Sequence, residues 1–569
     1  MDPKKVTQIH RRLAQALEGR GIDDPEALFE HYLGAGERAR AATHAAVAAK
    51  KAASALAFDR AAGFYRRALE LAPVRSAELV DLKRGLADAL VNAGRLAEAA
   101  QAYLEVAQVT SARHSLDFKR RAAQQLLMGG HINEGLDLIR SVLAAVGLTY
   151  PAGPRRALLS LLLKRLQIRL RGLKFTERDA SQIPEFDLVR LDTCFAGAAG
   201  LGWVDLIRGA DFQSRHLLLA LRAGEPYRVA RAMAFEAAYT ASRGGAASER
   251  AAQIARRAEE ISQKVGHPHA IGLSIWARGV GAYLVGHWKE AADLCERAAE
   301  VLRDQCTGVT WELTIANRFM LSALLYRGEI AEVSRRVPVL LSAALEQGNL
   351  FAATDLRTRI NLVWLAADDP TRARAEVIDA LKSWPHEGFY LQHYTSMQAL
   401  GQIEMYTGDT EVAYRHIQGQ WKALEQSMLF RIQILRIDAM HLQARVALAS
   451  AAGSKEKAHR LRIAERLAQQ IAKERIAWSS PFVTVIRAAI AWQRGEVSNS
   501  TGLLTEAVKG FDLADLALYA AATRRRLGET LGGDRGRELI AEANAWMLNQ
   551  NLQNPVAMTR TMTPGFDAT

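Results

Sequence analysis

Apolar and polar positions follow a helical period along the chain, and one arrangement returns roughly every forty residues. In the stretch VNAGRLAEAAQAYLEVA, residues 91 to 107, Gly94 follows an apolar run, and Ala99, Tyr103 and Val106 come five, nine and twelve residues later. These spacings are near multiples of 3.6, so the three side chains share one face of a second helix. Glycine permits the positive φ that a tight turn between antiparallel helices needs. The stretch therefore predicts a helical hairpin.

The same turn position recurs through the rest of the chain. The recurrences are Gly94, Gly130, Gly244, Gly286, Gly328, Asp368, Gly408, Gly453, Gly495 and Gly533. Most are 36 to 45 residues apart, and the long interval from 130 to 244 spans about three periods. Such self-similarity is typical of a solenoid, in which each hairpin buries its apolar face by stacking on its neighbours. With no long Val/Ile/Thr-rich alternating run present, we expect an all-α solenoid of about thirteen helical hairpins.

The stretch AAGFYRRALELAP, residues 61 to 73, resembles the second helix of a tetratricopeptide repeat. Ala61, Tyr65, Ala68 and Pro73 occupy its small, aromatic, small and proline positions. The later hairpins look like divergent relatives, because their period lengthens toward 42 and the closing proline disappears. The resemblance implies a right-handed superhelix whose concave surface, lined by the first helix of each hairpin, holds an extended peptide or a partner helix.

The candidate binding residues come from the predicted first helices. Ten residues before the turns at 286, 328, 368 and 408 lie Trp276, Arg318, Thr358 and Gln398, and Arg359 is next to Thr358. We take Trp276, Arg318, Arg359 and Gln398 as a candidate partner-binding stripe. The alternative is that Trp276 fills the core and the polar residues are solvated.

Two segments resemble the helical region that follows the ATPase module of large bacterial multidomain regulators. One is the opening, residues 9 to 71, and the other is residues 200 to 238, beginning GLGWVDLIRGADF. Such regulators often begin with a serine/threonine kinase or cyclase domain. The resemblance implies a non-catalytic sensory or scaffolding tail of a kinase-ATPase signalling protein, and it assigns no role to single residues. The alternative is a free-standing adaptor that binds peptides or assembles partner proteins.

Residues 154 to 174, PRRALLSLLLKRLQIRLRGLK, form the most unusual stretch because they are rich in leucine and arginine and lack acidic residues. The leucines from Leu159 to Leu173 recur at helical spacing. The candidate docking cations are Arg155, Arg156, Lys164, Arg165, Arg169 and Arg171. We expect the leucines to pack into the solenoid and the arginines to form a solvated face. The alternatives are that the helix docks an acidic partner or lies on an anionic membrane surface.

Charge and motifs argue against nucleic-acid binding and catalysis. The formal charge is +13, but the 61 acidic residues are interleaved with the basic ones along most of the chain. Without a basic face or a known nucleic-acid-binding pattern, we expect no nucleic-acid partner. The sequence also lacks a P-loop and the H-R-D and D-F-G motifs of kinases, so we expect no enzyme activity. Three cysteines with no C-x-x-C spacing suggest neither a zinc site nor a disulfide framework, and we expect no metal and no cofactor.

The remaining patterns concern location and organisation. The N-terminus has no apolar signal region and no run of 18 uncharged apolar residues occurs, so we expect a cytoplasmic protein. We divide the chain into N-terminal helices and tetratricopeptide-like repeats at 1–150, and a leucine/arginine-rich helix, loop and divergent repeats at 151–243. Repeats of longer period follow at 244–548, and a flexible tail at 549–569.

Overall fold

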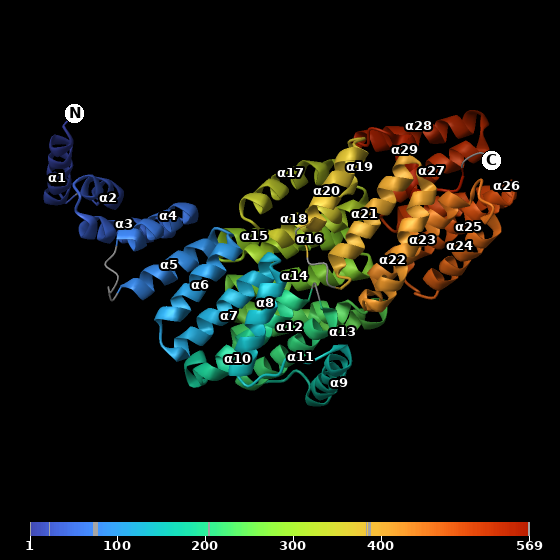
Figure 1. Ribbon diagram of the computed structural model, residues 1–569. Helices are drawn as coiled ribbons and strands as arrows, with labels where there is room; N and C mark the ends of the chain where they lie inside the picture. The colour runs from blue at the N-terminus through green and yellow to red at the C-terminus, as the bar shows by residue number, and fades with distance from the viewer. Residues whose placement is uncertain are drawn as a thin grey trace.

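The computed structural model describes residues 2–21, 23–71, 78–202, 205–382, 384 and 388–566. Within those residues the protein is all-helical, with 29 α-helices, four short 3-10 helices and no strand. The expected all-α fold is therefore confirmed. Figure 1 shows the helices following one another in chain order, with α1 to α4 projecting as an arm from a larger body.

The helices have the following bounds. The first nine are α1 (Pro3–Gly19), α2 (Pro25–Gly34), α3 (Arg38–Ser54), α4 (Phe58–Leu71), α5 (Leu79–Asn92), α6 (Leu96–Val109), α7 (Ala112–Gly129), α8 (Ile132–Ala145) and α9 (Pro154–Arg171). The next ten are α10 (Glu185–Leu201), α11 (Leu206–Ala223), α12 (Pro226–Ala241), α13 (Ser248–Val265), α14 (Pro268–Val285), α15 (Trp288–Gln305), α16 (Thr310–Arg327), α17 (Ile330–Glu346), α18 (Leu350–Thr358) and α19 (Leu362–Ala366). The last ten are α20 (Pro370–Lys382), α21 (Leu391–Thr407), α22 (Thr410–Gln426), α23 (Gln433–Ala451), α24 (Lys457–Ala472), α25 (Ser480–Gln493), α26 (Val497–Leu513), α27 (Ala517–Leu531), α28 (Gly533–Asn549) and α29 (Pro555–Met562). The 3-10 helices are η1 (Ala180–Gln182), η2 (Gly245–Ala247), η3 (Leu429–Arg431) and η4 (Ala477–Ser479).

Consecutive helices pack as antiparallel hairpins. The described part contains thirteen of them: α1/α2, α3/α4, α5/α6, α7/α8, α10/α11, α12/α13, α14/α15, α16/α17, α18 and α19 with α20, α21/α22, α23/α24, α25/α26 and α27/α28. Helices α9 and α29 belong to no hairpin. The long interval from 130 to 244 holds α9, which belongs to no hairpin, and the loops on either side of it, which explains why the sequence period is lost there.

The recurring turn residues adopt the conformation that the sequence predicts. All ten have positive φ, from 58° at Asp368 to 92° at Gly408; nine lie between two consecutive helices, and the tenth, Gly533, is the first residue of α28. Asp368 is the non-glycine member, and its carboxylate accepts hydrogen bonds from the Tyr406 hydroxyl at 2.6 Å and the Asn554 amide at 3.3 Å. These contacts offset the cost of a left-handed backbone in a residue with a Cβ.

The inward positions of the repeats are buried. Ala99, Tyr103 and Val106 on α6 are at most 4% exposed, so the frame that defines the repeat is the core of the solenoid. On α4, the small, aromatic and small positions of the tetratricopeptide pattern are also buried, and a Cβ on Gly85 of α5 would lie 2.5 Å from the Tyr65 ring. The proline of that pattern, Pro73, lies outside the described residues.

The superhelix coils tightly enough for its successive layers to touch. Hydrogen bonds join residues 186 to 188 positions apart: Gly245 N donates to Gln433 Oε1 at 3.0 Å, and Arg327 Nε donates to Asp515 Oδ2 at 2.8 Å. The turns of one layer therefore rest on hairpins of the next, and the concave interior is walled on more than one side.

The C-terminal segment differs from the prediction of a flexible tail. Residues 555–562 form α29, which packs against α21 and α27 with Met558, Met562 and Phe566 buried. Its backbone is held by distant arginines, since Arg445 donates to Thr561 O at 3.0 Å and Arg526 to Thr563 O at 3.0 Å. The prediction is wrong up to residue 566 because these partners lie on other helices, and residues 567–569 lie outside the described part. The boundaries at 150 and 243 stay predictions.

Candidate ligand-binding cavity

A cavity of about 880 Å³ lies inside the superhelix, between α9 and the inner helices α12, α14 and α16. Its far wall comes from the next layer, through residues of η3 and the start of α23. Six aromatic side chains line it: Phe235, Tyr239, Trp276, Tyr283, Trp311 and Phe319. Most of the remaining lining is aliphatic, as expected of a site that takes up apolar groups.

The aromatic side chains form a continuous wall. The Phe235 ring stacks on Trp311 at a centroid distance of 5.9 Å and an angle of 12°, and lies 5.4 Å from Trp276. Phe319 then links Trp276, at 6.3 Å, to Tyr283, at 5.3 Å. Because these rings come from three successive first helices, α12, α14 and α16, the repeat itself produces the wall.

A buried polar network closes the inner end of the cavity. Arg318 of α16 forms an ion pair with Asp355 of α18, and Arg359 donates to the Ser322 hydroxyl at 2.6 Å and to the Tyr283 hydroxyl. Behind them the Tyr326 hydroxyl donates to Asp438. Burial raises the pKa of Asp438 to about 6, although this hydrogen bond and the nearby arginines oppose the rise.

Three of the four candidates from the predicted first helices line this cavity. Trp276, Arg318 and Arg359 contribute to its wall, and Arg318 and Arg359 are cations held in place by neighbouring side chains rather than solvated positions. Gln398 does not line it. Helix α21 reaches the cavity only through Leu391, and seven further residues of helix carry Gln398 about 10 Å away.

Two buried polar atoms in the wall have no hydrogen-bond partner among the described residues. One is the donor Nε1 of Trp276, whose side chain is 3% exposed, and the other is the acceptor Oε2 of Glu236, which is 2% exposed. Buried polar groups are normally hydrogen-bonded, so an unpaired donor and an unpaired acceptor in one cavity indicate where a ligand can bind. The sequence pattern pointed to Trp276 but not to Glu236.

Helix α9 forms the outer wall of the cavity and is fixed to α11 by its inner face. Ala157 and Ile168 are buried, and the Ser160 hydroxyl donates to Asp211 at 2.7 Å. Asp211 also pairs with Arg215 at 2.8 Å, and Arg215 donates to Thr149 O just before α9. Thus the oppositely charged residues of α11 pair along the helix, as their spacing indicates, and also hold α9.

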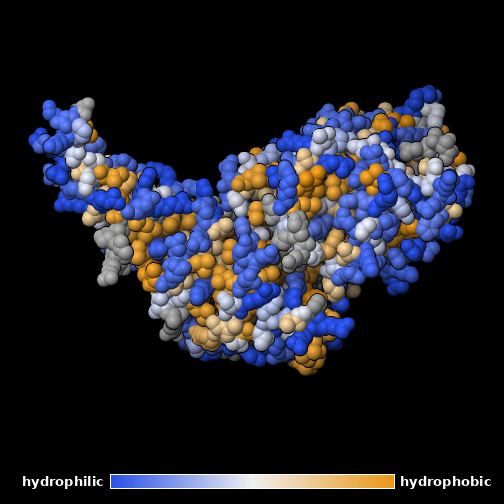
Figure 2. Space-filling model, in the orientation of Figure 1, coloured by the Kyte–Doolittle hydropathy of each residue, from blue (hydrophilic) through white to orange (hydrophobic). Residues whose placement is uncertain are grey.

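The leucine stripe of α9 does not pack into the solenoid. Leu159, Leu162, Leu163, Leu166 and Leu170 are 53 to 79% exposed. The expectation that they belong to the core is wrong, because the face of α9 that contacts α11 is already filled and the leucines lie on the opposite side. Figure 2 shows apolar surface at the lower edge of the molecule, where α9 protrudes in Figure 1.

The six candidate docking cations of α9 differ in their surroundings. Arg165 forms an ion pair with Glu236 at the cavity wall, and Arg171 donates to Leu221 O at 3.0 Å near the end of the helix. Lys164 and Arg156 line a second, smaller hollow of about 520 Å³ on the other side of α9. Arg155, Arg156 and Arg169 are exposed and make no hydrogen bond or ion pair within the described part of the chain.

The rim of the large cavity carries further arginines that the sequence pattern did not reveal. Arg243, Arg250 and Arg431 line it together with Arg169, and all four are exposed. None of them pairs with another described residue, whereas Glu236 is the one acidic side chain among the described residues of the wall. They lie in turns and at helix ends, where the repeat period gives no signal. The entrance is therefore cationic.

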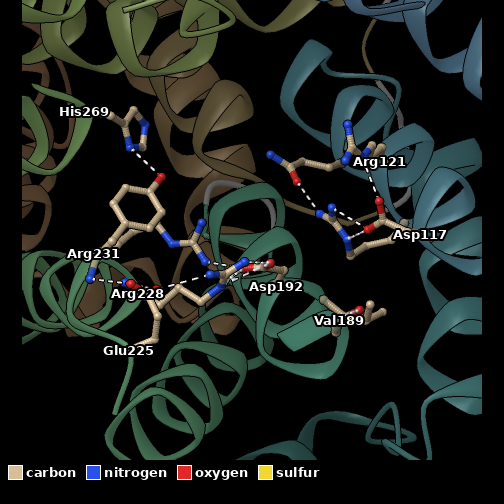
Figure 3. A network of polar contacts seen from close by, with 12 residues as sticks. Asp117, Arg121, Val189, Asp192, Glu225, Arg228, Arg231 and His269 are labelled. Carbon is tan, nitrogen blue, oxygen red and sulfur yellow. Dashed lines mark hydrogen bonds and ion pairs between the residues drawn. The ribbon is translucent and has the colours of Figure 1, made fainter. Parts of the chain in front are cut away.

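A network of charges holds the aromatic wall against the neighbouring hairpin. Figure 3 shows Asp192 of α10 between Arg228 and Arg231 of α12, at 2.9 Å and 2.5 Å. Burial opposes ionisation of Asp192, but the arginines around it keep its pKa below the ordinary value. In the same network the Tyr227 hydroxyl contacts His269 Nδ1 at 3.0 Å. The network positions α12, which carries Phe235 and Glu236.

Other chemistry is limited in the described residues. They contain no cluster of three metal-ligating side chains, and none of their helices combines the length and apolar run that a bilayer span needs. Cys194 and Cys295 are buried, and burial raises the pKa of the Cys194 thiol to about 12. These two thiols are therefore protonated at neutral pH.

No family model and no curated protein matches the sequence. Among solved structures, the chain is similar to the APC/C hetero-tetramer Cut9-Hcn1, with 14% identity, 94% of this chain and 93% of that chain covered, and a TM-score of 0.45. It is also similar to yeast Tom70, with 12% identity, coverage of 91% and 98%, and a TM-score of 0.27. A circular tandem repeat protein matches with 12% identity, coverage of 97% and 98%, and a TM-score of 0.12. Similarities this distant say nothing about what the chain binds. The arrangement of its own helices shows that the protein is a helical-hairpin solenoid.

Proposed function

We propose that this protein is a non-catalytic interaction scaffold that binds a peptide segment of a partner protein in the cavity between α9 and the inner helices. The observation that supports this most is the pairing of an unsatisfied donor, Trp276 Nε1, with an unsatisfied acceptor, Glu236 Oε2, in one aromatic wall. A peptide backbone offers a carbonyl to the first and an N–H to the second.

The wall and the rim define the peptide further. The six aromatic side chains favour apolar side chains on the ligand, and the unpaired rim arginines favour acidic residues beside them. The ligand in this proposal is therefore a short apolar segment flanked by aspartate or glutamate.

The role in the cell follows from the resemblance of residues 9 to 71 and 200 to 238 to the tails of bacterial signalling regulators. We propose that the solenoid is the sensory or scaffolding tail of a cytoplasmic serine/threonine kinase-ATPase protein. Since the cavity is bounded by two layers of the superhelix, a bound segment contacts both layers and alters how they pack. A free-standing adaptor with the same binding cavity is the second candidate.

The binding site is tested by filling the cavity. Ala238 lines it and is partly buried, so Ala238→Trp occupies the space that the peptide needs, whereas Ala545→Trp adds the same bulk on the exposed face of α28. Tagged wild-type and variant chains are purified from the source cells and the bound proteins quantified by mass spectrometry. A partner kept by Ala545→Trp and lost by Ala238→Trp supports the proposal, and identical partners in all three samples overturn it.

A separate measurement distinguishes the tail from the adaptor. An antibody to this region detects a polypeptide near 62.5 kDa if the scaffold stands alone, and a much larger one if it is joined to a kinase-ATPase portion. In the second case, Ala238→Trp also changes the kinase or ATPase rate.

A further inference from the structure

Helix α9 presents an apolar stripe that no described part of the molecule covers. Its five exposed leucines are more than half exposed, although the other helices of the solenoid mostly bury residues of this type. A contiguous row of large aliphatic side chains at the surface of a soluble repeat protein marks a contact site rather than core packing. The question is what the row contacts.

Helix α9 does not need its exposed leucines to hold its place in the fold. The helix is anchored through its opposite face, where Ala157 and Ile168 are buried and the Ser160 hydroxyl donates a hydrogen bond to Asp211 at 2.7 Å. Arg171 fixes the C-terminal end of α9 to Leu221 of α11. The leucines are therefore held outward on a fixed helix.

The charges around the stripe specify the partner. Helix α9 contains no acidic residue, and Arg155, Arg156 and Arg169, which are unpaired within the described chain, flank the leucines. Leucines on one face with long basic side chains beside them suit the boundary between lipid headgroups and acyl chains, where the cations reach anionic headgroups while the leucines enter the apolar layer. The protruding position of α9 leaves it accessible to a flat surface (Figure 1, Figure 2).

We propose that α9 is a membrane-docking helix that lies in the surface of an anionic bilayer, with Leu159, Leu163 and Leu170 inserted and Arg155, Arg156 and Arg169 on the headgroups. This inference does not depend on the proposed function, because none of the three leucines lines the large cavity, and of the three arginines only Arg169 also lies on its rim. Leu162 and Leu166 lie on the side of the stripe that faces the cavity, so the two sites are adjacent on one helix.

The test is co-sedimentation of the full chain with vesicles of phosphatidylcholine alone or mixed with phosphatidylglycerol. The chain is expected to bind the anionic vesicles and to leave them as salt is raised. Changing Leu159, Leu163 and Leu170 to Gln weakens that binding about tenfold or more, and changing Arg155, Arg156 and Arg169 to Glu weakens it about a hundredfold or more. The matched control changes three exposed aliphatic residues elsewhere, Val339, Leu513 and Leu531, to Gln and leaves binding unchanged.

Thermal unfolding of each variant checks that the fold is kept. The proposal is overturned if the wild-type chain does not bind anionic vesicles, if it binds neutral ones equally well, or if the α9 and control leucine variants lose binding to the same extent. Binding of the α9 stripe to a protein instead, with no vesicle binding, also overturns it.

Discussion

The ion pair between Arg165 and Glu236 gives the sharpest test of how α9 closes the cavity. Glu236 is 2% exposed, and apart from Arg165 its described partner is the Thr240 hydroxyl at 3.4 Å. Arg165→Met keeps most of the apolar stem but removes the charge, leaving a buried carboxylate with one weak hydrogen bond. Breaking a buried pair from one side costs about 3 to 5 kcal/mol. Part of the Arg165 side chain is exposed, at 31%, so the expected loss lies at the lower end of that range, near 3 kcal/mol.

Hydrogen exchange followed by mass spectrometry measures the effect locally, which suits a long repeat protein that does not unfold in one step. When α9 lifts away, Glu236 regains water, so Arg165→Met favours opening. Peptides from α9 should exchange about a hundredfold faster than in the wild type at pH 7. The double variant Arg165→Met with Glu236→Gln should restore most of the protection. Unchanged α9 exchange in the single variant, or no recovery in the double variant, refutes the reasoning.

The other predictions concern packing and pH. Gly85→Ala should destabilise the α4/α5 region by about 1 to 3 kcal/mol, because the new Cβ meets the Tyr65 ring. The control Gly63→Ala on α4, where the new Cβ enters open space, should be neutral or stabilising. Equal changes in the thermal unfolding of the two variants would contradict this prediction. Trp311→Ala should cost about 3 to 5 kcal/mol, because it empties part of the aromatic wall, whereas Trp311→Phe should cost clearly less in the same assay. The pKa of Asp438 is raised to about 6 from an ordinary value of 3.8, so its contribution to stability is complete below pH 3.8 and lost as the pH rises through 6. The total is about 3 kcal/mol, and Asp438→Asn should remove this part of the pH dependence of unfolding; an unchanged dependence would rule it out.

The hairpins were predictable because each one depends on local pattern. The offsets of Ala99, Tyr103 and Val106 from Gly94 describe one face of one helix, and that face is buried. Counting from the same turns also led to Trp276 and Arg318, since equivalent positions of successive first helices face the same interior, and to Arg359 as the neighbour of the counted Thr358.

What could not be predicted depends on distant parts of the chain. The contact between Gly245 and Gln433 reflects the summed rotation of several hairpins, which no single repeat encodes. Helix α29 is short and without a repeat, and its backbone is held by Arg445 and Arg526 from other hairpins. The sequence pattern placed the leucines of α9 in the core because helical spacing identifies the apolar face of a helix but not what packs against it. The arginines of the cavity rim lie in turns and at helix ends, so the repeat period of the sequence does not mark them.

The central claim is that the cavity receives a peptide segment of a partner. A photo-cross-linking amino acid placed at the rim, in place of Arg431, should capture a short apolar peptide flanked by acidic residues in the source cells, identified by mass spectrometry of the adduct. The same group in place of Arg335, on the exposed face of α17, serves as the control. The account predicts a discrete adduct from position 431 that is absent from position 335 and lost when Ala238→Trp fills the cavity. An adduct that survives Ala238→Trp, or that forms equally from both positions, would contradict it.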